Sequence, residues 1–387
     1  MQGNLKTLFL PGRARPLLPG ERFILDNGEE FNLVYDCGQI DFWLNPRPAK
    51  YISERIEQCF KDVKIDVLYI SHFHTDHINL LSYIEKSKGC CVKNVVLPYL
   101  TKSDLLLTII DKQVPADERT KQLLLKAAGD TEDSRETNYY LIPSIFPEKE
   151  EGTEEKSDDI EDNKNIIRNG QNILEKIPVS SSFPQKIVEF WKYLPYNNTK
   201  GQSGTIVNIL INELKNKHID PDNVKDVVNN MDDIRDIYDS LCESGKITKI
   251  QLNEQSTMLL SLPEVPSIKS YHFQNKKYVS EENLLGCLYF GDYPAKETPI
   301  EDKITDVIKA NFWCTGTIQI PYHGDRDGEL PEYCYYDKKC VVSHKIDSKN
   351  HPNKEIVYKI ISNDGILVNV KEDTGYFQHF EFDLNLL

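Results

Sequence analysis

The sequence predicts an α/β protein with a largely covered sheet, and three features lead to this expectation. Short apolar segments alternate with a helical pattern along the first hundred residues. A helical and charged region follows, and strand-like segments return in the last third of the chain. Strand–helix–strand alternation is typical of α/β folds with helices on the sheet faces. We therefore expect one α/β domain in two parts, 1–100 and 251–387, split by a mostly helical insertion at 101–250.

The first part begins with short strands. Residues 6–10, 22–26 and 31–38 are rich in apolar and aromatic side chains, and the turn-forming segments PGRARP and NGEE lie between them. Apolar residues fall on one face of an amphipathic helix at 51–60. The dense apolar run at 65–71 predicts a strand that is buried on both faces of a sheet.

A helix at 78–88 and a strand at 92–100 complete the first part. In the middle region, apolar and charged residues recur with a helical period. The helices that we expect there are 105–113, 120–129, 184–194, 204–217 and 222–245. Strand character then returns in six segments, which are 251–262, 283–292, 317–325, 338–344, 365–370 and 377–384.

An acidic stretch at 148–162 interrupts the helical region. It carries nine Asp and Glu residues against two lysines, and it has a single aliphatic residue. Such a composition buries too little apolar surface to order itself, which favours a solvated loop. The alternative interpretation is an acidic segment that mimics phosphate and shields a basic groove.

Composition excludes several classes of protein. The chain has 387 residues, a net charge of −15 and no apolar run of the roughly 18–20 residues that a membrane helix needs. The first residues lack the layout of a secretory signal. Nine cysteines include no C-x-x-C pair, which argues against a zinc ribbon and favours reduced thiols. We therefore expect a cytoplasmic protein with no membrane partner.

One segment concentrates residues that can carry chemistry. Ser71 to His77 reads SHFHTDH, follows a predicted buried strand and precedes a predicted helix. His72 and His74 are two residues apart in extended backbone, so they can project to the same side. Asp76 and His77 follow the bend and can face a second position. Imidazole and carboxylate groups suit zinc, iron or manganese, and two groups of ligands imply two metal positions.

This H-x-H-x-D-H motif after an apolar strand resembles the metallo-β-lactamase fold superfamily. Asp36 in VYDCG, Asp292 in LYFGDY and His323 in IQIPYHGD resemble further motifs of that superfamily, in the expected order. Within it, the chain looks most like the metallo-β-lactamase domain of the DNA-uptake channel protein of competent bacteria. The resemblance covers about residues 5–100 and 250–385. It implies an αββα sandwich.

The resemblance also implies roles for individual residues. A first metal would be held by His72, His74 and Asp292, and a second by Asp76, His77, His323 and the shared Asp292. Asp36 would orient a ligand imidazole, with a turn-capping role as the alternative. His351, in the His-Pro pair of the subfamily, would contact substrate phosphate or protonate a leaving group. An ordinary surface histidine is the alternative for His351.

One departure from the superfamily pattern bears on the first metal. Most members supply a further histidine before the strand that leads to Asp292, and here Asn253 or Ser256 occupies that region. His218 and His272 are the histidines between His77 and His323, and neither has matching context. A weaker first metal position is implied.

These observations lead to three hypotheses about function. The first is a metal-dependent phosphodiesterase or nuclease acting on DNA or RNA with one or two divalent ions, zinc or manganese. It includes a role as a bacterial defence effector. A bound cation lowers the pKa of its water from about 15.7 to about 7, so no protein nucleophile is needed. The second is hydrolysis of a small ester, thioester or lactam. The third is a subunit regulated by a protein partner that docks on the helical insertion.

Overall fold

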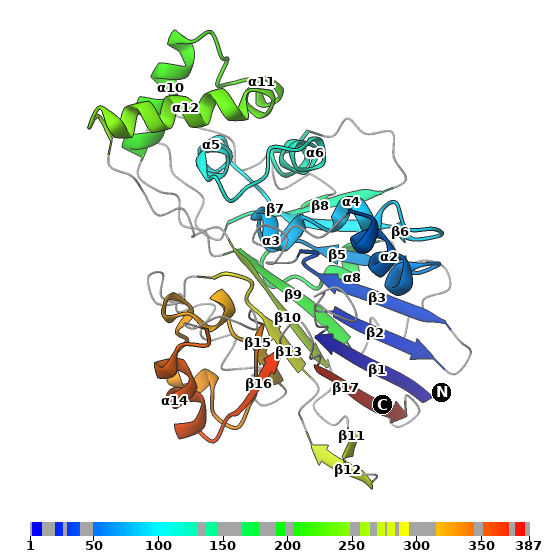
Figure 1. Cartoon of the computed structure of the whole chain (residues 1–387). Helices are drawn as coiled ribbons and strands as arrows, with labels where there is room; N and C mark the ends of the chain where they lie inside the picture. The colour runs from blue at the N-terminus through cyan, green and yellow to red at the C-terminus, as the bar shows by residue number, and fades with distance from the viewer. Residues whose placement is uncertain are drawn as a thin grey trace.

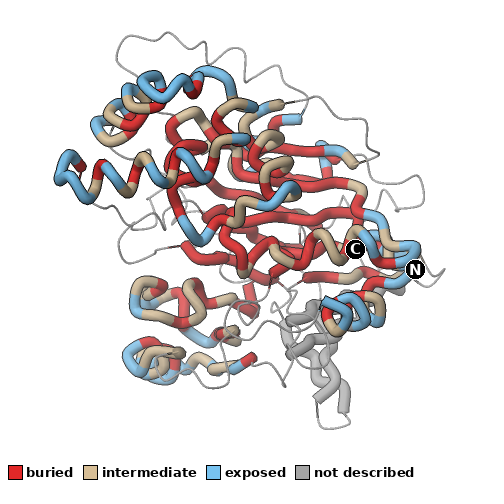
Figure 2. The backbone as a smooth tube through the Cα atoms, turned by 45° about the horizontal axis from the view of Figure 1, so that its top comes forward, coloured by how far each residue is buried: buried red, intermediate tan, exposed pale blue. Residues whose placement is uncertain are grey.

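Two large β-sheets lie face to face and helices cover their outer faces (Figure 1). Figure 2 shows buried backbone concentrated in the sheets and exposed backbone on the outer helices. The computed structural model describes residues 2–9, 20–25, 29–38, 49–130, 137–144, 165–177, 191–197, 204–247, 256–263, 269–274, 277–282, 286–293, 315–343, 351–370 and 376–383. The acidic stretch at 148–162 lies outside these residues.

Among the described residues the first sheet has nine strands, and the H-x-H-x-D-H motif follows a strand of its parallel half. Strands β3, β5, β7 and β8 are mutually parallel, whereas the strands on the other side of β3 pair antiparallel. In spatial order the strands are β12 (Lys277–Glu282), β11 (Lys269–Gln274), β17 (Tyr376–Asp383), β1 (Gln2–Phe9), β2 (Gly20–Leu25), β3 (Glu30–Tyr35), β5 (Val67–Tyr69), β7 (Asn94–Pro98) and β8 (Asn138–Ile142).

In the part of the chain that the structure describes, the second sheet has six strands, and four of them run parallel. Strands β13 to β16 are parallel neighbours, and β10 pairs antiparallel with both β13 and β9. A separate small sheet joins β4 (Lys64–Ile65) to β6 (Cys91–Val92). The spatial order of the six strands is β16 (Ile366–Val370), β15 (Lys339–Ser343), β14 (Thr315–Gln319), β13 (Gly286–Tyr289), β10 (Thr257–Pro263) and β9 (Trp191–Asn197).

Helices lie on both outer faces of the sandwich (Figure 1). Within the described residues, no helix combines the length and apolar character needed to cross a membrane. The helices near the first sheet are α2 (Ala49–Phe60), α3 (Thr75–Ile78), α4 (Leu81–Ile84), α5 (Lys102–Ile110), α6 (Glu118–Ala127), α10 (Gly204–Asn216), α11 (Val224–Asn229) and α12 (Met231–Glu243). The others are α8 (Ile173–Lys176), α14 (Lys354–Ser362) and the 3₁₀ turns η2 (Tyr322–Gly324), η3 (Arg326–Gly328) and η4 (Glu332–Cys334).

Three apolar clusters separate the four layers. One joins the first sheet to helices α2 to α6 and α10 to α12. The second lies between the two sheets and contains aromatic side chains from both, such as Tyr35, Tyr69 and Tyr289, whose rings stack. The third joins the second sheet to α14 and η4. Because each sheet is covered on both faces, the architecture is an αββα sandwich.

A buried carboxyl group links the two sheets. Glu21 on β2 accepts hydrogen bonds from the hydroxyls of Tyr193 on β9 and Ser261 on β10, both at 2.8 Å, and from Tyr289 on β13 at 3.1 Å. Burial raises the pKa of Glu21 to about 7, although these hydroxyls act in the opposite direction. The group therefore holds a proton in the folded protein under mildly acidic conditions.

Several sequence-based expectations need correction. The segment predicted as one strand at 317–325 is a strand only as far as Gln319, where β14 ends, and then forms the 3₁₀ turn η2. The helix predicted at 222–245 is two helices, α11 and α12. The helix predicted at 184–194 is wrong from Trp191 onward, because β9 begins there; residues 184–190 are not described. Strand β9 is apolar on both faces, with Tyr193 between the sheets and Leu194 in the third cluster, so it lacks the alternation of a half-buried strand. The helix predicted at 78–88 is two short helices, α3 and α4, the first of which begins at Thr75.

Other parts of the middle region agree with the expectation. Helices α5, α6, α10, α11 and α12 all lie within 101–250. The same region also contributes β8 to the first sheet and β9 to the second. The exact domain boundaries stay a prediction. The eight cysteines among the described residues form no disulfide.

Candidate metal centre

The ends of parallel strands bring distant polar residues to one edge of the sandwich. Asp36 follows β3 and the His72 loop follows β5, and these two strands are parallel neighbours. Asp292 follows β13 and His323 follows β14, which are also parallel. Because parallel strands end at the same edge of a sheet, each sheet presents its polar residues together. The backbone N–H of Thr257 on β10 donates to the Ser71 carbonyl at 3.0 Å, which joins the two edges.

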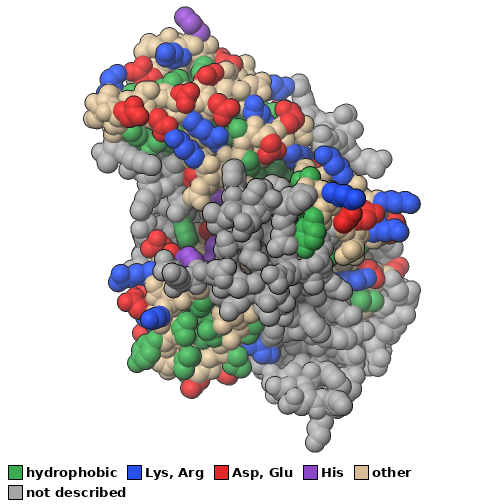
Figure 3. Space-filling model, in the orientation of Figure 1, with side chains coloured by type: hydrophobic (Ala, Val, Ile, Leu, Met, Phe, Trp, Pro, Cys, Tyr) green, Lys and Arg blue, Asp and Glu red, His purple; other side chains and the backbone are tan. Residues whose placement is uncertain are grey.

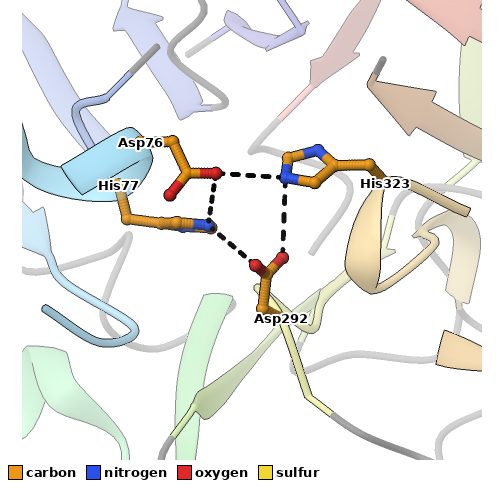
Figure 4. Close-up of side chains that lie close together, drawn as sticks. All are labelled: Asp76, His77, Asp292 and His323. Atoms are coloured by element: carbon orange, nitrogen blue, oxygen red, sulfur yellow. Dashed lines mark hydrogen bonds and ion pairs between the residues drawn. The ribbon is translucent and has the colours of Figure 1, made fainter. Parts of the chain in front are cut away.

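Two clusters of possible metal ligands form at this edge. The first contains His72, His74 and Asp292, and the second contains Asp76, His77, Asp292 and His323. In the second, His77 Nε2 lies 3.4 Å from Asp292 Oδ2 and 3.8 Å from Asp76 Oδ2. Figure 4 shows the four side chains of the second cluster converging from the α3 region, β13 and η2. Asp292 belongs to both clusters.

His323 and the shared carboxylate close the arrangement. His323 Nε2 lies 3.3 Å from Asp76 Oδ2 and 3.8 Å from Asp292 Oδ1. On the other side, His72 Nε2 lies 4.0 Å from Asp292 Oδ2. The side chains of Asp76 and His323 keep 22% and 24% of their surface exposed, so solvent reaches this cluster. Figure 3 shows histidine side chains in a hollow between the upper helices, α5 and α10 to α12, and the part of the molecule that carries α14.

Hydrogen bonds fix one nitrogen of His72 and one of His77. Asp36 Oδ2 accepts from Ser71 Oγ at 2.7 Å and from His77 Nδ1 at 2.8 Å. Because the hydroxyl proton of Ser71 points to Asp36, its oxygen accepts from His72 Nδ1, 2.9 Å away. Both Nδ1 atoms are therefore protonated, which leaves the Nε2 lone pairs for a ligand. His72 Nε2 is buried and has no hydrogen-bond partner among the residues that the structure describes.

The other two imidazoles are anchored in the same way. His323 Nδ1 donates to the carbonyl of Ser343 at 2.9 Å, so its Nε2 is the available nitrogen. His74 Nε2 donates to Asp111 Oδ2 at 2.9 Å, so its Nδ1 is available instead. A metal-binding histidine in proteins almost always donates its other ring N–H to a carboxylate or carbonyl. These residues fit one or two divalent cations.

The electrostatics of the clusters also favour a cation. Burial disfavours positive charge on His77 and His323, but the carboxylates of Asp292 and Asp76 outweigh it and raise the pKa of both imidazoles. Burial likewise opposes ionisation of the two carboxyls, yet the neighbouring histidines lower the pKa of each. His72 differs, since burial, together with His77 and His74, holds its pKa well below the usual value. It therefore stays neutral, as a metal ligand must.

Strained backbone accompanies these side chains. Tyr322 and His323 both have φ of 52°, and Asp36 has φ of 57°, in the left-handed region that non-glycine residues rarely adopt. Each such residue costs on the order of 1–3 kcal/mol and persists where the surroundings fix it. Two of these residues are held by hydrogen bonds. His323 Nδ1 donates to the Ser343 carbonyl, and Asp36 accepts from the backbone N–H of Ser71.

Gly38 lies in the loop after β3 and packs closely against the backbone of Asp76 and His77. We expect Gly38→Ala to disrupt the site. An added Cβ would lie 2.0 Å from the carbonyl oxygen of Asp76 and 2.3 Å from the amide nitrogen of His77. These are backbone atoms, so helix α3 must shift. We expect a loss of about 1–3 kcal/mol in the free energy of unfolding, measured by urea denaturation, together with weaker metal binding.

Gly245→Ala is the control for this substitution. Gly245 has φ of 72° and open space around its Cβ position, so alanine there carries a backbone penalty alone. A Gly38→Ala variant that binds metal as tightly as Gly245→Ala would contradict the prediction.

Some residues considered in the sequence lie outside the two clusters. His351 is partly buried and lies two residues before Asn353, whose N–H donates to the carbonyl of Gly324, but neither cluster includes His351. Ser256 accepts from the backbone N–H of Asp292 at 3.2 Å and so supports the turn that carries this carboxylate. His218 is exposed at the end of α10. Asn253 lies outside the described residues.

Sequence reasoning missed three groups that orient ligands. Ser71 lies within the motif, and its place directly before His72 was the signal available. Asp111 follows α5 in the insertion, and Ser343 contributes a backbone carbonyl, which no side-chain pattern reveals. Contacts of this kind depend on the tertiary fold.

Comparisons with known proteins concern the fold. No protein-family model matches the sequence, and no curated protein matches it. Solved structures do match, at low identity. The metallo-β-lactamase fold protein YhfI from Bacillus subtilis is 7% identical with a TM-score of 0.30, over 97% of this chain and 100% of that one. Unliganded yeast PDE1 is 11% identical with a TM-score of 0.41, over 98% and 100%.

A long form of RNase Z from yeast is 8% identical with a TM-score of 0.36, over 98% of this chain and 48% of that chain. The fold class itself follows from the architecture of this chain. Two face-to-face sheets, helices on both outer faces and a His/Asp edge formed by strand ends make up a metallo-β-lactamase-type αββα sandwich. This confirms the fold class predicted from the sequence.

Proposed function

We propose that the protein is a metal-dependent hydrolase of phosphodiester bonds, with DNA or RNA as substrate and zinc or manganese as the metal. The observation that carries this proposal is the pair of ligand clusters that share Asp292. A divalent cation bound at such a donor set activates water and polarises a phosphoryl oxygen, and paired sites suit in-line displacement at phosphorus. The resemblance to the DNA-uptake domain, through Asp36, Asp292 and His323, favours the same substrate class.

The residues of the chain have distinct tasks in this proposal. The cations would be held by Asp292 and by five side chains near it, which are His72, His74, Asp76, His77 and His323. Asp36 and Ser71 hold the imidazoles in one orientation, so that binding requires little rearrangement. The partly exposed Asp76 and His323 lie where a substrate would enter. His351 is a candidate for contact with substrate phosphate, since an imidazole N–H can donate a hydrogen bond to a phosphate oxygen.

The test is hydrolysis by protein loaded with manganese, zinc or magnesium. The substrates are single-stranded DNA, duplex DNA, RNA, bis(p-nitrophenyl) phosphate and p-nitrophenyl acetate. We expect cleavage of at least one phosphodiester with one of the metals, abolished by chelation and restored by adding the metal back. His218→Asn, at an exposed histidine outside the clusters, should cleave as the unchanged protein does. Turnover of the acetate ester with every phosphodiester intact would favour the small-ester hypothesis instead.

A further inference from the structure

A short loop from the insertion supports the metal-ligand motif. This support loop comprises Asp111 to Val114 and directly follows helix α5. The carbonyl of Gln113 accepts hydrogen bonds from the Thr75 backbone N–H at 2.9 Å and from its hydroxyl at 2.6 Å. Asp111 accepts from His74 Nε2 at 2.9 Å through one carboxylate oxygen and from Gln113 N at 2.8 Å through the other. The loop thus holds two consecutive residues of the motif.

Helix α12 also contacts the support loop. Arg235 donates from Nε to the Ile109 carbonyl at 2.7 Å, and from Nη2 to the carbonyls of Val114 at 2.6 Å and Asp111 at 3.2 Å. Its side chain is only 13% exposed. One guanidinium therefore satisfies one carbonyl in the last turn of α5 and two in the support loop, and it also complements the negative end of that helix.

These contacts form a continuous connection from the insertion to one metal ligand. Arg235 fixes the backbone of Asp111, and the Asp111 carboxylate fixes the imidazole of His74. His74 belongs to the three-ligand cluster and is absent from the four-ligand one. With three protein ligands, the first position has no spare donor to compensate for a misplaced imidazole.

We propose that helix α12 controls the three-ligand metal position, with Arg235 and Asp111 as positioning residues for His74. This inference rests on the proposed metal binding. It adds a role for α12, whose packing against the support loop would affect one of the two adjacent ion positions. Changes in the α12 contact alter binding of the ion at His72, His74 and Asp292. The ion at the four-ligand position keeps its affinity.

The experiment is a titration of the metal-free full-length protein with Mn²⁺ and with Zn²⁺, read by native mass spectrometry and by calorimetry. We expect Asp111→Ala to weaken binding of one of two ions by about 10- to 100-fold and to leave the other unchanged. Arg235→Met should weaken the same ion by about 3- to 10-fold, because hydrogen bonds to the loop are lost. Arg235→Lys, which keeps the charge and one donor group, should fall between Arg235→Met and the unchanged protein.

The matched control is Lys102→Met. Lys102 lies in the first turn of α5, at the other end of that helix from the support loop, and its side chain pairs with Asp222 at the surface. This variant should bind both ions as the unchanged protein does. A second readout needs no metal: ¹⁵N NMR of the metal-free protein at pH 8 should place the His74 proton on Nε2, and Asp111→Ala should abolish this preference.

The outcomes separate this inference from the proposed function. Two ions bound with the same affinities by Asp111→Ala, Arg235→Met and the unchanged protein would overturn the role of α12 and leave the metal-dependent hydrolase standing. Equal weakening of both ions in Arg235→Met would overturn it as well, since the effect would then be general. An unchanged protein that binds no ion would overturn both.

Discussion

Replacing Asp292 with asparagine is expected to remove most bound metal and to lower phosphodiester hydrolysis at least about 100-fold. Asp292 is the one side chain common to both clusters, and its oxygens lie 3.4 Å from His77 Nε2, 3.8 Å from His323 Nε2 and 4.0 Å from His72 Nε2. Replacing groups that merely support a ligand already costs about 10- to 100-fold in affinity or activity. Loss of a shared charged ligand should exceed that range.

The substitution also changes the electrostatics around the histidines. The Asp292 carboxylate is the largest of the influences that raise the pKa of His77 and of His323. Asparagine keeps the size of the side chain but removes this charge, so the attraction for any cation falls. The measurement is elemental analysis of the purified protein beside initial rates with the substrate that the unchanged protein cleaves.

Asp364→Asn is the control for this variant. Asp364 has φ of 57° at the end of α14, a conformation that asparagine also tolerates, and it lies outside both clusters. It should keep its metal and its rate. An Asp292→Asn protein that retains two ions per chain would show that the shared carboxylate is not a ligand.

The core of the candidate site could be predicted because its ligands lie at strand ends. A short apolar strand, a bend and a helix start around Ser71 to His77 are local features, and local patterns are what a sequence shows. Asp36, Asp292 and His323 each follow an apolar segment that is a strand in the structure. Parallel pairing then brings them to one edge, and this consequence follows from the fold class alone.

The groups that orient the ligands could not be predicted in the same way. Asp111 is 37 positions from His74, and Arg235 is 124 positions from Asp111. Nothing in the local sequence distinguishes Asp111 from other exposed-looking acids in a chain that has 61 Asp and Glu residues. The pairings arise only when α12 packs beside α5, which is a tertiary contact.

Strand β9 shows a second physical limit. Its residues WKYLPYN are buried on almost every side, so the apolar pattern has neither the period of two of a half-exposed strand nor a polar face. Read together with residues 184–190, the start of this segment has apolar and charged residues at a spacing that predicts a helix. The contacts that make this segment a strand are its pairing with β10 and the packing around Trp191, and their partners are distant in the chain.

Glu21→Gln is expected to stabilise the metal-free protein at alkaline pH by about 3 kcal/mol. Burial raises the pKa of Glu21 from 4.5 to about 7, and a difference of this size between the folded and unfolded states corresponds to that free energy. Below pH 4.5 both states hold the proton and the unchanged protein suffers no penalty. As the pH rises toward 7, the unfolded state loses the proton first, so the free energy of unfolding falls. Glutamine resembles the protonated carboxyl and removes this decline.

The measurement is the free energy of unfolding by urea, from pH 4.5 to pH 8, in the presence of chelator. The gain from Glu21→Gln should be near zero at the acidic end and grow with pH, because only the carboxyl ionises. The amide is accommodated because the hydroxyls of Tyr193, Ser261 and Tyr289 can reorient toward it. Glu54→Gln, on the exposed face of α2, should change stability by less than about 0.5 kcal/mol throughout. A gain for Glu21→Gln that is the same at both pH extremes would mean that Glu21 is ionised inside the folded protein. Its three hydroxyl partners would then be stabilising a buried charge rather than a neutral acid.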